Sequence, residues 1–423
     1  MPRKKYAWSI DDPPEIAPHS LAKHRILREY VEEYIRVLTA NPRTDCLRMT
    51  LVDGFAGGGI YRDPSSHVSH PGSPTILLDA VRTAEAAVNA MRSKPFRVDA
   101  SYFLVDRDPS ALACLREVLR RRPGWDTERE SVHVLDGSFE DHLPNIIQSI
   151  RSRGRAGRSI FVLDQYGYTA APADLLRRIF NTLPNAEVFL TVAIGWAATY
   201  LPDLRTAAAQ LGIPQDFLSL VASHGEDGPR VDDMPTLFRL QVLLREVFAT
   251  AAGSRYYTPF FIVSRKSNRA YWFLHMANNA RANDVVKTLH WRVENHFEHF
   301  GGPGLAMLGY DPKRDHALIG QQRFGFDDPA RERTRSALVS SLAGHFAAQN
   351  ASGVRFDRLF EQLCNDTPAT KAMLGTAVRE LCVEGELEKT GGRGEKREPA
   401  TFPKDDDDIR LARQPSLFRR RKS

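Results

Sequence analysis

The sequence predicts an α/β protein in which a doubly wound, mainly parallel, seven-stranded sheet is followed by a C-terminal winged helix-turn-helix. Five short apolar runs alternate with amphipathic helical segments between residues 48 and 196, a pattern typical of a parallel sheet covered on both faces. Two β-rich runs follow at 255–266 and 270–278, too close together for a crossover helix, so they are expected to pair antiparallel. Three helical segments and two short strands then end the chain, as in a winged helix.

The individual elements follow from local periodicity. The first is expected to be a helix, because apolar residues recur at helical spacing in SLAKHRILREYVEEYIRVL. The expected parallel strands are RMTLVDGF (48–55), ASYFLVDRD (100–108), SVHVLDG (131–137), SIFVLDQYG (159–167) and AEVFLTVAIGW (186–196). The expected intervening helices are SPTILLDAVRTAEAAV, PSALACLREVLRRR, FEDHLPNIIQSI and PADLLRRIFNTL.

Chain length and local composition predict the domain organisation. At 423 residues, the chain is too long for one small domain, and its 42% of apolar residues is enough for a substantial core. We expect a sheet domain over residues 1–328, with a helical insertion at about 197–250, because Asp-Asp-Pro at 327–329 interrupts the pattern. The winged helix is expected at 329–415 and a basic tail at 416–423.

Cysteine usage and hydropathy exclude several classes of protein. The four cysteines lie far apart without a C-x-x-C pair, so the sequence predicts no metal site, no iron–sulfur cluster and no disulfide framework. This usage suits a reducing compartment, and we expect a cytoplasmic protein. No run approaches the roughly 20 apolar residues that span a bilayer, so no membrane association is expected. The net charge of +6 mildly favours a polyanionic partner.

Aspartate ends each of the first four predicted strands, at Asp53, Asp106, Asp136 and Asp164. Ligands bind at the carboxyl ends of parallel strands in open α/β sheets, and buried carboxylates need donors or cations nearby. The alternative is that each aspartate only caps the helix that follows it. Four aspartates at one predicted sheet edge favour a binding site.

The glycine-rich stretch TLVDGFAGGGIY (50–61) follows the first of these strands. A P-loop is excluded because Ile60 and Tyr61 stand where Lys and Ser or Thr are required. The dinucleotide fingerprint is a weak match, because it fits at Gly57 and Gly59 but has Arg62 at its third glycine. The pattern D-x-F-x-G-x-G, formed by Asp53, Phe55, Gly57 and Gly59, resembles motif I of S-adenosylmethionine-dependent methyltransferases. A parallel sheet that finishes in an antiparallel hairpin is also the outline of class I methyltransferases.

This resemblance implies a binding site for S-adenosylmethionine. Asp53, Phe55, Gly57 and Gly59 would contact the methionine portion of the cofactor. Asp106 stands where an acid would accept both ribose hydroxyls, with Asp108 as the alternative, and Asp136 stands near the expected adenine amine.

The fourth strand ends in Asp164-Gln165-Tyr166-Gly167, where the methyl acceptor normally lies. This segment resembles the D-P-P-Y motif of methyltransferases that act on amines of adenine or cytosine in nucleic acids. The resemblance implies that Asp164 accepts a hydrogen bond from the exocyclic amine and that Tyr166 stacks on a flipped base. Both prolines of the motif are absent, and the alternative is that Asp164 caps a helix while Tyr166 packs beneath it.

The chain as a whole resembles the three-Cys-motif partner proteins. The matching segments are KHRILREYVEEY, VDGFAGGGIY, GSPTILL, YFLVDRDP and FVLDQYG, together with a terminal winged helix. Members of this family more often have D-P-F-G where this chain has Asp164-Gln165-Tyr166-Gly167. The resemblance implies a methyltransferase-like sheet and a partner protein with a cysteine triplet of the radical-S-adenosylmethionine kind, which would hold an iron–sulfur cluster.

The predicted winged helix carries basic residues suited to phosphate contact. We expect Lys371 and Arg379 on the outer side of its third helix, and Arg393, Lys396 and Arg397 at the wing tip. Several glutamates and the run KDDDD (404–408) lie close by and would repel a phosphate backbone. Docking of another protein is therefore the alternative to nucleic-acid binding.

Two further segments are expected to lie near the predicted site. The segment RDPSSHVSHPGSP, between the glycines and the next helix, is expected to be a lid or a surface loop. Lys23 and His24 begin the first helix, where His24 is expected to pack in the core, although a helix in this position can cover the cofactor.

The leading hypothesis is an S-adenosylmethionine-dependent methyltransferase acting on an exocyclic amine in nucleic acid, with a three-cysteine partner protein. A second hypothesis is a non-catalytic, methyltransferase-like docking protein, which the altered segment at Gln165 favours. A third is a DNA-binding protein that acts through its winged helix.

Overall fold

The structure is a computed structural model in which the chain divides into two compact units, Met1–Leu289 and His290–Ser423. It describes residues 7–64, 66, 68–122, 131–154, 156–164, 173–193, 219, 253–264, 269–293, 299–300, 323–324, 328–348, 353–392 and 394–412. Tyr166, Arg393, the basic tail and, apart from residue 219, the predicted helical insertion lie outside the described residues.

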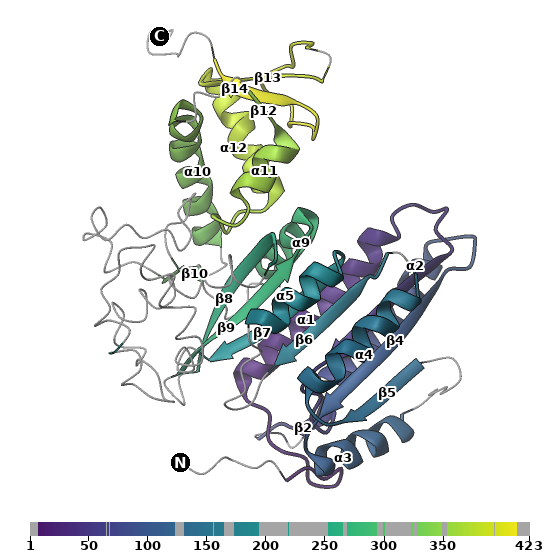
Figure 1. Ribbon diagram of the computed structural model, residues 1–423. Coiled ribbons are helices and arrows are strands. Elements are labelled where there is room, and N and C mark those ends of the chain that lie inside the picture. Colours follow the sequence, from purple (N-terminus) through teal and green to yellow (C-terminus); the bar gives the residue numbers. More distant parts are fainter. Residues whose placement is uncertain are drawn as a thin grey trace. The chain divides into compact units, whose positions relative to one another are not determined.

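Seven strands of the first unit form one sheet in the order β5-β4-β1-β6-β7-β9-β8 (Figure 1). The strands are β1 (Cys46–Asp53), β4 (Arg97–Asp106), β5 (Ser131–Asp136), β6 (Ser159–Asp164), β7 (Ala186–Ala193), β8 (Tyr256–Ser264) and β9 (Arg269–Ala277). The first five are parallel, and β9 pairs antiparallel with both β7 and β8. Numbered along the chain, the order is 3-2-1-4-5-7-6, that of class I methyltransferases, which confirms the predicted fold.

Helices cover both faces of this sheet. They are α1 (Pro18–Leu38), α2 (Ser73–Ala90), α3 (Pro109–Arg120), α4 (Phe139–Ser152), α5 (Ala173–Thr182) and α9 (Ala280–Val293). Figure 1 shows α4 and α5 in front of the sheet and α1 behind it, where α1 packs against α2. The central strands are apolar because neither face meets water: Leu51, Ile160 and Leu163 are fully buried. None of the described helices has the length and apolarity needed to cross a bilayer.

The segment between the glycines and α2, expected to be a lid or loop, contains a short hairpin. Strands β2 (Ile60–Arg62) and β3 (Ser69–Pro71) pair antiparallel. The chain ahead of α1 lies alongside this hairpin, since the Ile16 N–H donates to the Arg62 carbonyl at 2.9 Å and the Arg62 N–H to that of Pro14 at 3.0 Å. The N-terminal segment and the hairpin therefore form one small structure beside the glycine loop.

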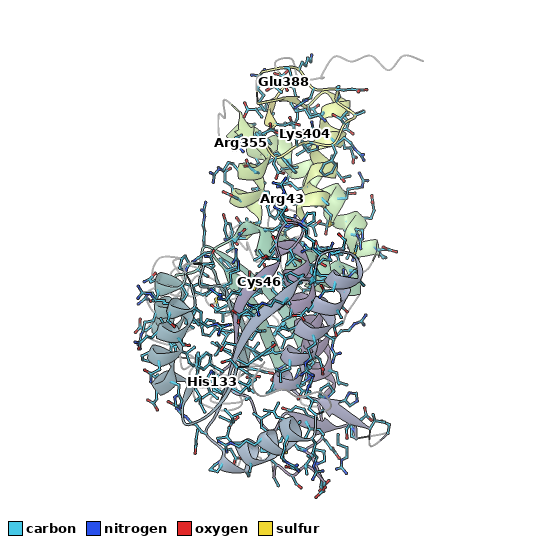
Figure 2. All side chains as sticks on the ribbon, turned by 90° about the vertical axis from the view of Figure 1, so that its right-hand side faces the viewer. Arg43, Cys46, His133, Arg355, Glu388 and Lys404 are labelled. Atoms are coloured by element: carbon cyan, nitrogen blue, oxygen red, sulfur yellow. The ribbon has the colours of Figure 1, made fainter. Side chains whose placement is uncertain are left out.

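The second unit contains the predicted winged helix. Its elements are β10 (His299–Phe300), β11 (Arg323–Phe324), α10 (Asp328–Ala348), β12 (Val354–Arg355), α11 (Phe356–Leu363), α12 (Lys371–Glu384), β13 (Leu387–Thr390) and β14 (Asp408–Leu411). Helix α12 begins at the Thr370 cap and ends at Gly385, whose φ of 80° gives the left-handed turn common after helices. Figure 2 labels Arg355 of β12, Glu388 of β13 and Lys404 in the loop before β14. Strand β14 pairs with both β12 and β13.

Candidate functional site

The four strand-end aspartates lie at one edge of the sheet, because β1, β4, β5 and β6 are parallel neighbours. Asp53, Asp106, Asp136 and Asp164 are each the last residue of their strand. Asp106 is directly opposite Asp136 in the register of the sheet. The sequence therefore located this row of carboxylates correctly.

Other residues cap the helices that follow the first three of these strands. The cap position of α2 is Gly72, while Asp108 caps α3 by accepting from the Ser110 N–H at 2.9 Å. Ser138 caps α4 by accepting from the Asp141 N–H at 3.1 Å. Helix capping therefore does not account for the aspartates that end β1, β4 and β5. It does account for Asp108.

The glycine loop is bonded directly to the end of β4. The N–H of Gly57 donates to Oδ2 of Asp106 at 2.8 Å, and the N–H of Ala56 donates to the Val105 carbonyl at 2.9 Å. Gly57 has a φ of 59°, in the left-handed region that favours glycine. Oδ1 of Asp106 accepts from the Asp108 N–H at 2.9 Å. From the described residues each carboxylate oxygen thus accepts one bond, and a carboxylate offers about four acceptor positions.

Asp53 is a buried acid at the start of the glycine loop. Its side chain is fully buried, and its Oδ1 accepts from the Phe55 N–H at 3.1 Å. Its Oδ2 is buried without a hydrogen-bond partner among the described residues. Burial raises the pKa of Asp53 to about 7, although the Ser73 side chain and then the Phe55 N–H favour the charged form. The half-buried Phe55 lies beside Phe139 of α4, with ring centroids 6.5 Å apart.

Asp136 differs from its neighbours because its side chain is exposed. Its carbonyl lies 2.9 Å from Nε2 of His142, and the N–H of the next residue, Gly137, donates to the Asp106 carbonyl at 3.0 Å. The backbone therefore holds the ends of β4 and β5 together while the Asp136 carboxylate faces solvent.

Asp164 forms an ion pair that the sequence did not reveal. The Lys23 ammonium lies 2.7 and 2.5 Å from its two carboxylate oxygens, and the side chains of Lys23 and Asp164 are only 5% and 18% exposed. Burial acts to raise the pKa of Asp164, but the Lys23 ammonium outweighs it and holds that pKa below its usual value. Lys23 could have been suspected, because it precedes the buried Leu27 and Tyr30 by one and two helical turns.

His24 lies in the core beside this ion pair. It is buried, as expected, and its Nδ1 has no hydrogen-bond partner among the described residues. Burial and the neighbouring Lys23 lower its pKa to about 4, so the imidazole is neutral at pH 7. His24 therefore adds no charge to the Lys23–Asp164 pair.

Trp8 is a residue at the site that the sequence did not reveal. Its half-buried indole lies against the backbone of the glycine loop: a Cβ added at Gly57 would lie 2.9 Å from the nearest indole carbon, and one added at Gly58 would lie closer still. The ring also meets Tyr61 of β2 edge-on, with centroids 5.3 Å apart. The glycines imply that some group lies close to the loop backbone. On one side of the loop, that group is the indole of Trp8.

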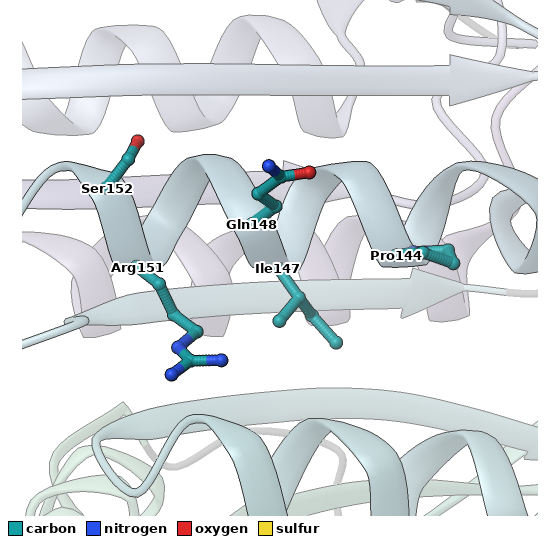
Figure 3. A pocket seen from close by; sticks show the side chains of 5 residues that line it. All are labelled: Pro144, Ile147, Gln148, Arg151 and Ser152. Carbon is teal, nitrogen blue, oxygen red and sulfur yellow. The ribbon is translucent and has the colours of Figure 1, made fainter.

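Two other kinds of site were sought among the described residues, a metal site and a surface hollow. Groups of three or more side chains suited to a metal ion are absent from the part of the chain that the structure describes. A hollow of about 430 Å³ lies on α4, lined by Pro144, Ile147, Gln148, Arg151 and Ser152 (Figure 3). It contains none of the predicted site residues.

Two of the basic residues predicted to bind nucleic acid are paired with acids of the winged helix itself. Nζ of Lys371 lies 2.6 Å from Oδ1 of Asp405, in the segment before β14. The Arg397 guanidinium lies 3.0 Å from the buried Asp407 carboxylate and 3.1 Å from that of Glu395. The acidic run therefore holds the wing segment against the rest of the unit, a role the sequence did not indicate.

The other described members of the predicted nucleic-acid surface are open to solvent. Arg379 of α12 and Lys396 of the wing both have exposed side chains. Of the four predicted residues that the structure describes, these two are the most exposed.

Comparisons with known proteins support the C-terminal assignment. Residues 309–391 match the family described as the GMT-like wHTH domain. Among solved structures, the chain resembles a DUF574 family protein from Streptomyces avermitilis MA-4680, at 11% identity and a TM-score of 0.28, over 60% of this chain and 83% of that one. It also resembles a protein described as a possible exported protein from Bordetella parapertussis, at 13% identity and a TM-score of 0.24, over 63% and 71%. No curated protein matches the chain. The match over residues 309–391 supports the winged helix-turn-helix of the C-terminal unit.

Proposed function

We propose that this protein is an S-adenosylmethionine-dependent methyltransferase that acts on an exocyclic amine in nucleic acid. The observation that carries the proposal is the bond from the Gly57 N–H to the Asp106 carboxylate. It joins the loop that resembles motif I to the acid that ends the second strand, within a sheet of class I strand order. The glycine loop and the strand-end acid, both of which the cofactor would require, therefore lie side by side.

The chemistry of these residues fits the proposed cofactor. The unused acceptor positions of Asp106 suit ribose hydroxyls. The unpartnered Oδ2 of Asp53 suits a nearby cationic donor, because a buried oxygen without a partner is costly. The proposed contacts also include Phe55, Gly59 and, toward the adenine, Asp136. S-adenosylmethionine would supply the electrophilic methyl group, and the protein would supply binding and orientation.

We assign the methyl acceptor to the end of β6. Asp164 would accept a hydrogen bond from the exocyclic amine and orient it, while Tyr166 would stack on the base. Lys23 keeps Asp164 ionised, and a carboxylate is a stronger acceptor than a neutral acid. Each oxygen of Asp164 has a further acceptor position besides the one that faces Lys23.

The remaining assignments concern domains and partners. We propose a methyltransferase-like domain at 1–328 and a winged helix at 329–415 that contacts nucleic acid, chiefly through Arg379 and Lys396 because their side chains are exposed. A cytoplasmic location, and a three-cysteine partner protein that would hold an iron–sulfur cluster, rest on the sequence alone. Co-purification with that class of protein tests the partner.

A non-catalytic docking protein is the second candidate function. The contact of Lys23 with both oxygens of Asp164 favours it, because an ammonium already lies where the substrate amine would be oriented. The indole of Trp8 against the glycine loop favours it in the same way. In this case the sheet would be an inherited framework, and the winged helix would bind the partner.

Calorimetric titration with S-adenosylmethionine and S-adenosylhomocysteine tests cofactor binding. Binding that falls about 10- to 100-fold in Asp106→Asn, from the loss of hydrogen bonds to a charged acceptor, is the expected result. Asp108→Asn is the matched control, because asparagine also caps helices well and this variant should bind like the wild type. If the wild type gives no heat of binding with either compound, the proposed methyltransferase function is wrong.

Transfer of a labelled methyl group to DNA, RNA and protein fractions then separates the candidates. We expect label in nucleic acid and its loss in Asp164→Asn and Asp164→Ala. Cofactor binding without transfer to any fraction would favour the docking protein. Nucleic-acid binding without cofactor binding would favour a DNA-binding protein.

A further inference from the structure

The side chain of Trp8 occupies one side of the glycine loop. A Cβ on Gly57 would lie 2.9 Å from Cζ2 of the indole, and one on Gly58 would overlap Cε3, its nearest indole atom. Real Cβ atoms essentially never come so close to other heavy atoms, so the indole packs against bare backbone. Gly57 and Gly58 are both buried, and Trp8 is part of what covers them.

The segment that carries Trp8 is anchored a few residues further along. Two backbone hydrogen bonds join residues 14–16 to Arg62 of β2. The Arg62 guanidinium lies 3.4 Å from Asp12 and 3.5 Å from Glu15. Trp8 therefore reaches the loop from an attached segment, and the edge-on contact with Tyr61 orients its ring. Such an arrangement can release the indole while the segment stays bound.

We propose that Trp8 competes with the cofactor for the glycine loop, so that a nucleoside sulfonium ligand must displace the indole before it binds. This inference rests on the proposed function, because it names a gate for the same site. The backbone of Gly57 and Gly58 is the surface that the motif offers to a ligand, and one face of it cannot contact two rigid groups at once.

The competition sets the apparent affinity of the ligand. A ligand that binds only the open form has an apparent dissociation constant equal to the intrinsic one divided by the open fraction. If the covered form exceeds the open form by about ten to one, removal of the indole lowers the dissociation constant about tenfold. A residue that formed a wall of the ligand site would have the opposite effect, because its removal would weaken binding.

Titration of the full-length chain with S-adenosylhomocysteine, followed by calorimetry and tryptophan emission, tests the proposal. We expect Trp8→Ala to bind about tenfold more tightly than the wild type. The wild type should show a red shift of emission on binding, as the indole enters water, and Trp8→Phe should lose that shift. Trp291→Phe is the control, since Trp291 is buried in the second unit and should alter neither quantity.

Gly58→Ala tests the contact without any ligand. Gly58 does not have the left-handed φ of Gly57, so alanine is tolerated by the backbone, but its Cβ would overlap the indole. We expect this variant to show red-shifted Trp8 emission by itself, with an unchanged circular dichroism spectrum.

The outcomes separate the two proposals. If the wild type binds and a folded Trp8→Ala binds equally or less tightly, the gate is wrong and the proposed function stands. If neither protein binds S-adenosylmethionine or S-adenosylhomocysteine, the proposed function and the gate both fail. Unchanged emission in Gly58→Ala would also overturn the gate, because the contact would then not hold the indole.

Discussion

The ammonium of Lys23 lies 2.7 and 2.5 Å from the two carboxylate oxygens of Asp164, which joins the first helix to the end of β6. Both groups are largely buried, so each depends on the other for compensation of its charge. The pair lies at the sheet edge where the other strand-end aspartates lie. It therefore links the stability of the fold to the ionisation of the proposed acceptor residue.

Replacement of Lys23 by methionine should destabilise the protein by about 3–5 kcal/mol, because it leaves a buried carboxylate without its partner. Urea unfolding at pH 7 measures this loss. Lys94→Met, at an exposed lysine, should change the free energy of unfolding by no more than about 0.5 kcal/mol. A loss of the same size in both variants would show that the Lys23–Asp164 pair has no special role.

The pH dependence of this loss has a definite sign. In the wild type, the pKa of Asp164 lies below its usual 3.8, so the pair stabilises the protein above that pH and the effect fades in acid. Without Lys23, burial raises the pKa of Asp164, and the folded protein then gains stability as the pH falls. The difference between Lys23→Met and the wild type should therefore shrink steadily from pH 7 to pH 4.

Asp53→Asn should remove a pH dependence of stability whose sign is opposite to that of Asp164 in the wild type. Burial raises the pKa of Asp53 from 3.8 to about 7, so the folded state retains a proton that the unfolded state releases. The contribution of this group to stability is therefore fully present below about pH 4 and is lost as the pH rises to 7. Asparagine cannot ionise, so the free energy of unfolding of the variant should vary less with pH over this range. Parallel profiles for the two proteins would contradict the assignment.

Tyr30→Phe should cost about 1–3 kcal/mol, because it removes a donor from a buried acid. The Tyr30 hydroxyl donates to Oε2 of Glu187, which also lies 3.2 Å from Nε2 of His275, and all three side chains are buried. Tyr34→Phe is the control, since the described structure shows no hydrogen bond between Tyr34 and Glu187. Equal costs in thermal or urea unfolding would exclude a specific role for the Tyr30 bond.

Tyr30 should also contribute to alkaline unfolding. Burial and then the Glu187 carboxylate raise the pKa of Tyr30 well above its usual value of 10.0. Its contribution to stability is therefore complete below pH 10 and is lost as the pH rises further. The stability of the phenylalanine variant should fall less steeply above pH 10.

The winged helix should bind nucleic acid more tightly when its acidic segment is neutralised. Asp405→Asn removes the carboxylate that pairs with Lys371, so the Lys371 ammonium can attract a phosphate more strongly. Arg379→Ala and Lys396→Ala should each weaken binding and lower the salt slope by about 1, since their side chains are exposed. Fluorescence anisotropy with labelled duplex DNA and RNA over a range of salt concentrations measures both effects. Affinity independent of all three changes would favour a protein as the ligand of this surface.

The sequence by itself determined the sheet, its flanking helices and the winged helix. Parallel strands covered on both faces must be apolar throughout, so β1 and β6 were visible as short apolar runs that each end in an aspartate. The end of such a run also marks the carboxyl edge of the sheet, which is why the row of aspartates could be placed. The pair of β-rich runs at the end of the sheet fixed the antiparallel β8–β9 hairpin.

The hairpin of β2 and β3 could not be predicted in the same way. Each strand has three residues, too few for an alternating pattern, and neither strand is buried. Its pairing depends on the Gly72 N–H, which donates to the Gly59 carbonyl at 2.9 Å, and on the N-terminal segment alongside.

Only the tertiary structure decided which charged and aromatic groups meet at the site. Lys23 and Asp164 are 141 positions apart, and Trp8 meets a loop that begins after β1. Periodicity predicts which face of an element is buried. It does not predict which residue of another element lies opposite that face. The pairing of Lys371 with Asp405 follows the same rule, because the acidic run alone gives no sign of what it neutralises. Local spacing thus determined the elements, and the close packing of distant side chains determined the contacts at the site.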